Sequence, residues 1–112
     1  MGEVYRARDP KLNRDVAIKV LPSEVARDPE RFSRFRREPT LLAALNHPYV
    51  AAIHGLEESD GSPFLVLELV EGEVLAERLK QRAISVDDPL EIGRATAEVL
   101  EEAHEKGIIH RD

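Results

Sequence analysis

The run Val16–Leu21 constrains the fold more than any other stretch, because it is apolar, rich in β-branched residues and interrupted by a single lysine. Such a run is typical of a buried strand. Side chains alternate along a strand, so Lys19 shares a face with Ala17 and Leu21. An ammonium group on an apolar face needs an anionic partner or a water-filled cleft. The strand therefore predicts an anion beside Lys19, and the alternative is a lysine that reaches solvent from a sheet edge.

The composition restricts what that anion can belong to. The chain has 112 residues, of which 42% are hydrophobic, which is enough for one modest core. A net charge of -6 argues against a general nucleic-acid or anionic-membrane surface, so any phosphate must be bound locally. The absence of cysteine excludes disulfides and makes a cytoplasmic location the simplest interpretation. No apolar run approaches the roughly 20 residues of a membrane span, and the histidines lack metal-ligand spacing, so we expect no membrane segment and no metal site.

The remaining pattern predicts a mixture of strands and helices. Residues 2–9 alternate, and turn residues at 9–13 connect them to the lysine strand, which predicts a hairpin. The later elements follow from apolar runs, helical periodicity and a Gly that ends the last helix. They are strands at 49–56 and 64–70 around a polar turn at 57–63, a short helix near 74–79, and a long helix over 85–106.

A helix after the lysine strand supplies a candidate anion. Asp28 followed by a proline is typical of a helix start, and the apolar positions that follow place Glu38 on the buried stripe. A carboxylate there and an ammonium on the neighbouring strand are each costly alone and reasonable together. We therefore predict that Glu38 pairs with Lys19, for function or only as a buried ion pair that fixes the register. Pro39 directly follows, and we expect it to kink the helix.

These features in order resemble the eukaryotic-type protein kinases, especially the bacterial serine/threonine kinases. The motifs are Gly2-Glu3-Val4, the V-A-I-K that ends at Lys19, Glu38 on a helix, and a final H-R-D that ends at Asp112. The resemblance implies an α+β fold: the antiparallel sheet and helix C of a kinase N-lobe, then the hinge and first helices of the C-lobe. It implies a partial N-lobe over 1–70 and the beginning of the C-lobe over 71–112, cut at both ends.

The same resemblance implies roles for individual residues. Lys19 matches the lysine that contacts the α- and β-phosphates of ATP, Glu38 matches its partner, and Asp112 matches the catalytic aspartate that orients the substrate hydroxyl. The other nucleotide contacts come from the remnant glycine loop, from the residues above and below adenine, and from the gatekeeper and hinge. In this sequence those positions are Gly2, Val4, Ala17, Leu67, Glu68 and Val70.

The function implied is the ATP-binding portion of a kinase that transfers the γ-phosphoryl group of Mg-ATP to protein Ser or Thr hydroxyls. The residues that hold Mg²⁺ in this family lie beyond Asp112, so we expect the 112-residue chain alone to be inactive. Two alternatives remain: a non-catalytic nucleotide-binding or scaffold relative, and a small-molecule phosphotransferase of related fold. The expected partners are ATP and a protein substrate, without nucleic acid.

Overall fold

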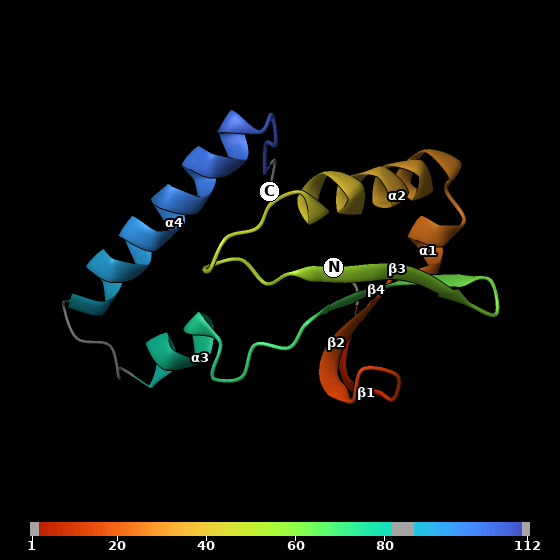
Figure 1. Cartoon of the computed structure of the whole chain (residues 1–112), viewed down its shortest axis with the longest axis horizontal. Helices are drawn as coiled ribbons and strands as arrows, with labels where there is room; N and C mark the ends of the chain where they lie inside the picture. The colour runs from red at the N-terminus through yellow and green to blue at the C-terminus, as the bar shows by residue number, and fades with distance from the viewer. Residues whose placement is uncertain (1–2, 82–86, 111–112) are drawn as a thin grey trace. The chain divides into compact units, whose positions relative to one another are not determined.

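A computed structural model describes residues 3–81 and 87–110 of the chain. Within these ranges, Glu38 and Leu41 are described by their backbone alone. Figure 1 shows the order of the elements along the chain, with the sheet and two helices first and two further helices after them. The chain forms two compact units. The first contains residues 1–46 and 51–70, and the second contains residues 47–50 and 71–112. Gly2 and Asp112, both predicted to be site residues, lie outside the described residues.

The first unit is built on a four-stranded antiparallel sheet with the strand order β1-β2-β4-β3. Strand β1 (Val4–Asp9) and strand β2 (Arg14–Val20) form the hairpin that the sequence predicts. In its turn, the Asp9 carboxylate accepts the backbone N–H groups of Lys11 and Leu12, at 2.9 and 3.3 Å. Val16 and Ala17 of β2 are buried, so the lysine-bearing strand lies in the core of this unit.

The second hairpin corrects the predicted strand limits. Strand β3 (Ile53–Ser59) starts four residues later than predicted and includes the acidic residues assigned to the turn, and strand β4 (Ser62–Glu68) starts two residues earlier. The turn is only Asp60-Gly61, with φ values of 50° and 76°. Two central residues with positive φ make the tight turn whose twist matches that of paired strands. Polar composition suggested a long loop, but exposed edge positions of a strand are polar too.

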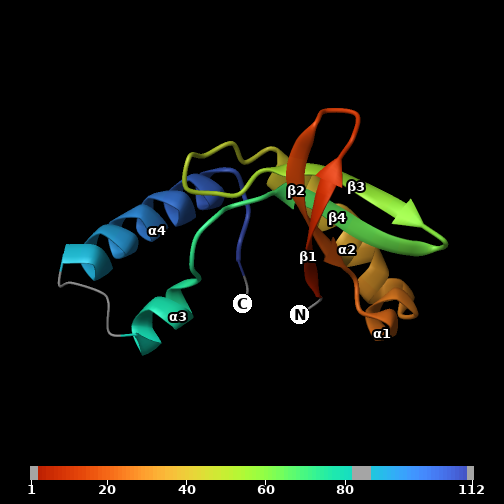
Figure 2. The same ribbon diagram turned by 90° about the horizontal axis from the view of Figure 1, so that it is seen from below.

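Helices α1 (Ser23–Ala26) and α2 (Pro29–Ala43) follow the first hairpin. Asp28 caps α2 as predicted, because its Oδ1 accepts the N–H of Glu30 at 3.0 Å and that of Arg31 at 3.3 Å. The helix continues through Pro39, so the proline does not end it. The side chain of Pro39 is buried. Helix α2 packs along β3, as Figures 1 and 2 show. Burial of the ring offsets part of the cost of the missing backbone hydrogen bond.

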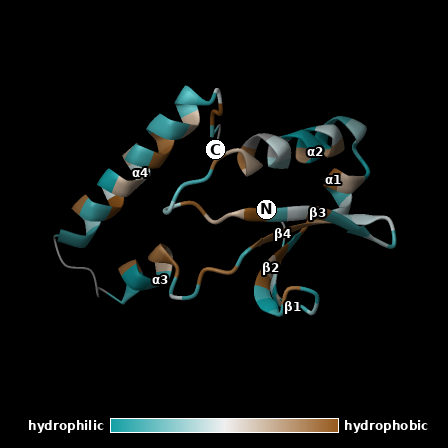
Figure 3. Cartoon of the chain, viewed as in Figure 1, coloured by the Kyte–Doolittle hydropathy of each residue, from teal (hydrophilic) through white to brown (hydrophobic). Residues whose placement is uncertain are grey.

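The second unit contains α3 (Leu75–Lys80), α4 (Asp87–Glu105) and the segment 47–50. Figure 3 shows hydrophobic and hydrophilic residues alternating along α4, which fits its predicted amphipathic stripe. Gly107, with φ of 75°, ends this helix. Its N–H donates to the His104 carbonyl at 3.0 Å, and the Ile108 N–H donates to the Ala103 carbonyl at 2.8 Å. These two bonds form a Schellman motif, which requires a left-handed residue that glycine adopts without strain.

The described helices include none that could cross a membrane, since each is too short or too polar for a span.

Candidate functional site

The strand register brings four of the predicted site residues onto one face of the sheet. Val4 is paired with Lys19 across β1 and β2, and Ala17 is paired with Leu67 across β2 and β4. Directly paired residues share a face, and so do residues two apart in one strand. Lys19 and Ala17 are two apart, so both pairs lie on the same side. Residues up to 63 positions apart in sequence therefore form one surface.

This surface combines apolar groups with one cation. Ala17 is buried with 9% of its area exposed, Val4 is 60% exposed, and Leu67 and Lys19 are half-buried. Small and branched apolar side chains form a flat surface on which a planar ring can lie, and an ammonium beside it attracts negative charge. The arrangement thus fits a ligand that is apolar at one end and anionic at the other.

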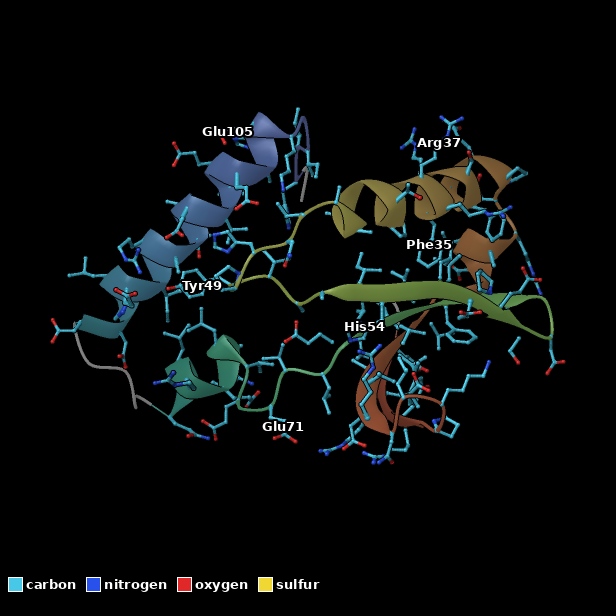
Figure 4. The ribbon with its side chains drawn as sticks, in the orientation of Figure 1. Phe35, Arg37, Tyr49, His54, Glu71 and Glu105 are labelled. Carbon is cyan, nitrogen blue, oxygen red and sulfur yellow. The ribbon has the colours of Figure 1, made fainter. Side chains whose placement is uncertain are left out.

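Lys19 has no ion pair with any side chain that the structure describes. The side chain of Glu38, its predicted partner, lies outside what is described, so their pairing stays a prediction. The backbone of Glu38 belongs to α2, and Figure 4 shows that Phe35, one turn earlier, points from α2 toward the sheet. The helix that carries the predicted partner therefore packs on the same sheet as Lys19.

The end of β4 holds a contact that the sequence did not reveal. The N–H of Glu68 donates to the Ala52 carbonyl at 2.8 Å, and the Glu68 Oε2 accepts the Ala52 N–H at 2.9 Å. One residue thus satisfies both backbone groups of the residue before β3. Val70, two residues further on, is 68% exposed. The backbone at the end of β4 is therefore fixed before the chain leaves the first unit.

In the second unit, a buried histidine organises the segment 47–50. The side chain of His47 is 5% exposed, and its Nε2 lies 3.2 Å from Glu98 Oε1 and 3.7 Å from Glu102 Oε2. Its Nδ1 accepts the backbone N–H of Tyr49 at 3.1 Å. Because Nδ1 is an acceptor, the ring proton of neutral His47 lies on Nε2 and points to Glu98. His47 thus has a structural role, and it fixes this segment on α4.

Charge pairs on the surface shift two carboxyl pKa values. Arg6 and Arg8 of β1 donate to Asp15 at 2.6 and 3.0 Å, and these hydrogen bonds hold the pKa of Asp15 below its usual 3.8. Arg94 binds Glu91 in α4 and lowers the pKa of that carboxyl group. Neither residue is a site candidate, so these shifts report surface pairing.

The opposite face of the sheet is hollowed, and the hollow is lined by none of the predicted site residues whose side chains the structure describes. An open hollow of about 320 Å³ has a floor that includes Val16, Ile18 and Val66, which alternate with the site residues. Charged side chains of the first hairpin form its rim: Arg8, Asp9, Lys11 and Arg14.

Comparison with known proteins identifies the family. The model of the protein kinase domain matches residues 1–112. The chain is 41% identical to the serine/threonine-protein kinase PknB of Mycobacterium leprae and 42% identical to PknA of Mycobacterium tuberculosis, with the whole chain aligned in both cases. It covers 19% and 27% of those proteins. The crystal structure of the Mycobacterium tuberculosis PknI kinase domain matches all of the chain and 46% of that domain, with a TM-score of 0.88 and 35% identity.

The chain therefore belongs to the protein kinase domain family, and its fold is that of a kinase, α+β with an antiparallel sheet and packed helices. Both of these relatives are named serine/threonine-protein kinases. It spans about a fifth to a quarter of the length of these curated relatives, 19% and 27%.

Proposed function

We propose that this chain is the ATP-binding portion of a serine/threonine protein kinase. The observation that carries the proposal is the shared face of Val4, Ala17, Lys19 and Leu67, which gives an apolar surface beside a cation. Adenine is planar and largely apolar on its faces, and the triphosphate is anionic, so the surface fits both ends of the nucleotide. The kinase relatives support the reaction, which is transfer of the γ-phosphoryl group to a protein Ser or Thr hydroxyl.

In this proposal, each residue of the shared face has one task. Val4 and Ala17 pack against adenine from the sheet, and Leu67 is the gatekeeper beside it. The Glu68 carbonyl and the backbone of Val70 meet the adenine edge, and the pair of bonds between Glu68 and Ala52 supports this by fixing that backbone. Lys19 binds the α- and β-phosphates, and Gly2 belongs to the loop above them.

The catalytic residues of the proposal lie partly outside the described residues. Glu38 orients Lys19 from α2, and Asp112 accepts or orients the proton of the attacking hydroxyl. Bound Mg²⁺ would supply positive charge against the negative charge that develops on the phosphates during transfer. The protein ligands of Mg²⁺ in this family follow the H-R-D motif, so we propose that they lie beyond Asp112 in sequence.

The two compact units support a division into lobes. We propose that residues 1–70 form part of the small lobe with the start of the hinge, and that 71–112 begin the large lobe. Val70 ends the first unit and Glu71 belongs to the second, which supports a boundary there. We also propose a cytoplasmic location, where ATP and protein substrates are present, and no nucleic-acid partner.

A titration with two ligands tests the nucleotide site. We compare binding of ATP and of adenosine to the chain, to Lys19→Met and to Lys11→Met, which removes an exposed charge in the first turn. Loss of a charge-assisted phosphate contact of about 1.5–3 kcal/mol should weaken ATP binding roughly tenfold or more in Lys19→Met. Adenosine binding should stay unchanged, because it lacks phosphate. Equal ATP binding by all three proteins would contradict the site.

A transfer assay tests the reaction separately. With radiolabelled ATP and a basic protein substrate, we expect the 112-residue chain to transfer no phosphate, and a longer protein that extends beyond Asp112 to transfer it. Asp112→Asn in the longer protein should abolish transfer and leave ATP binding intact. A longer protein that binds ATP without transfer would favour a nucleotide-binding scaffold instead.

A further inference from the structure

Arginine is concentrated in the short segment that leads into and forms most of α2. Residues 27–37 contain five arginines and two acidic residues, a net charge of +3 in a chain whose net charge is -6. Counting Glu38 as well leaves +2. All five are exposed: Arg27, Arg31, Arg34, Arg36 and Arg37. This segment is therefore a local basic surface on an acidic chain.

Three of these arginines form a row on the outer side of α2. Arg31, Arg34 and Arg37 follow at intervals of three residues, which places neighbouring side chains beside one another on a helix surface. Figure 4 shows Arg37 pointing away from the sheet, whereas Phe35 points toward it. The row spans about 9 Å along the helix axis at 1.5 Å per residue. We call Arg31, Arg34 and Arg37 the α2 arginine row.

The charges of this row are available to a ligand. Arg31 lies 3.5 Å from Asp28, and Arg34 lies 3.0 Å from Glu30, in pairs whose side chains are 44% to 78% exposed. Exposed pairs of this kind contribute little to stability, so a better anion can replace the carboxylate. Arg37 has no ion pair or hydrogen bond with any described side chain. The row thus offers one guanidinium without a described partner and two with weak partners.

We propose that the α2 arginine row is a docking surface for an acidic segment, rich in Asp and Glu, of a partner protein. Several carboxylates in succession match three cations spread over about 9 Å, whereas a single phosphate group contacts one or two of them. The net charge of -6 disfavours long polyanions and anionic membranes, which would meet the rest of the chain, but permits a short acidic segment at one local site. The surface lies outside the nucleotide site proposed above, so the inference does not depend on that site.

Binding of labelled peptides to the full chain, followed by fluorescence anisotropy, tests the proposal. The probe is a ten-residue peptide that alternates Glu and Ser, with Gln in place of Glu in the neutral control. We expect the acidic peptide to bind and its affinity to fall with salt, and the neutral peptide not to bind. The double variant Arg34→Gln, Arg37→Gln should bind about five- to tenfold more weakly, as two lost surface ion pairs imply.

A matched variant separates the row from net charge. Lys11→Gln with Lys80→Gln removes the same two charges from exposed positions elsewhere, and it should bind like the unchanged chain. Equal loss in both double variants would overturn the proposal, because the effect would then be general. A peptide with one phosphoserine and no acidic residues that binds as tightly as the acidic peptide would overturn it too. The proposal would also be overturned if the chain bound anionic lipid vesicles through Arg34 and Arg37 but did not bind the acidic peptide.

Discussion

Replacing Pro39 with alanine should stabilise the chain, although the residue is buried. An interior helical proline costs about 3 kcal/mol relative to alanine, since it lacks the N–H that would bind the Phe35 carbonyl and disfavours helical geometry at Glu38. The α2 helix runs through Pro39 in spite of this cost. Alanine restores the backbone N–H donor and removes the steric conflict at Glu38, so the stabilisation comes from the helix backbone.

The buried ring reduces that gain. Pro39→Ala removes two ring methylenes, each worth about 0.8 kcal/mol when buried, or roughly 1.6 kcal/mol together. The expected net effect is therefore a stabilisation of about 1.4 kcal/mol, or an increase in the thermal midpoint of roughly 6 °C for a chain of this size. Circular dichroism at a helix wavelength, followed during heating, measures it.

Pro39→Gly is the control for helix propensity, because it restores the same donor and loses the same two methylenes, together with the Cβ that alanine keeps. Glycine costs about 1 kcal/mol relative to alanine in a helix, so this variant should be less stable than Pro39→Ala by at least that amount. A midpoint for Pro39→Ala equal to or below that of the unchanged chain would refute the reasoning. It would mean that the Phe35 carbonyl already accepts a hydrogen bond from another group, and that packing of the proline ring outweighs the cost of proline in the helix.

Three further predictions follow from individual contacts. In thermal unfolding, Gly107→Ala should destabilise the chain by about 1–2 kcal/mol through the positive φ alone, because nothing lies within 4 Å of an added Cβ. Gly93→Ala inside α4 is the control and should stabilise the chain by about 1 kcal/mol. His47→Ala should cost about 1–3 kcal/mol in urea unfolding, because it leaves the Tyr49 N–H without its acceptor, while the exposed His54→Ala should change little. Asp15→Asn should lower the thermal midpoint at neutral pH. The difference in midpoint from the unchanged chain should vanish as the pH falls through the lowered pKa of Asp15, below 3.8, because the native carboxylate then also becomes neutral. A constant difference down to pH 2 would contradict this.

Local chemistry in the sequence was enough to predict several elements. The β-branched run around Lys19, the Asp28-Pro29 helix start and the glycine after α4 each act through their own backbone and near neighbours, so they form where predicted. The short motifs also identified the kinase family, since V-A-I-K and H-R-D depend on order along the chain. These inferences required no knowledge of which segments pack together.

Tertiary packing decided the rest. The sequence predicted a strand from residue 49, but β3 begins only at Ile53. The Tyr49 N–H instead donates to His47, whose ring also contacts Glu98 of α4. The order β1-β2-β4-β3 and its register placed Leu67 beside Ala17, fifty residues away in sequence. The helix continues through Pro39, whose buried ring offsets part of the cost of a proline inside a helix. The local pattern sets the helix or strand preference of each segment, which is worth about 1 kcal/mol. Burial against residues far along the chain outweighs a preference of that size, so tertiary contacts decide which structure forms.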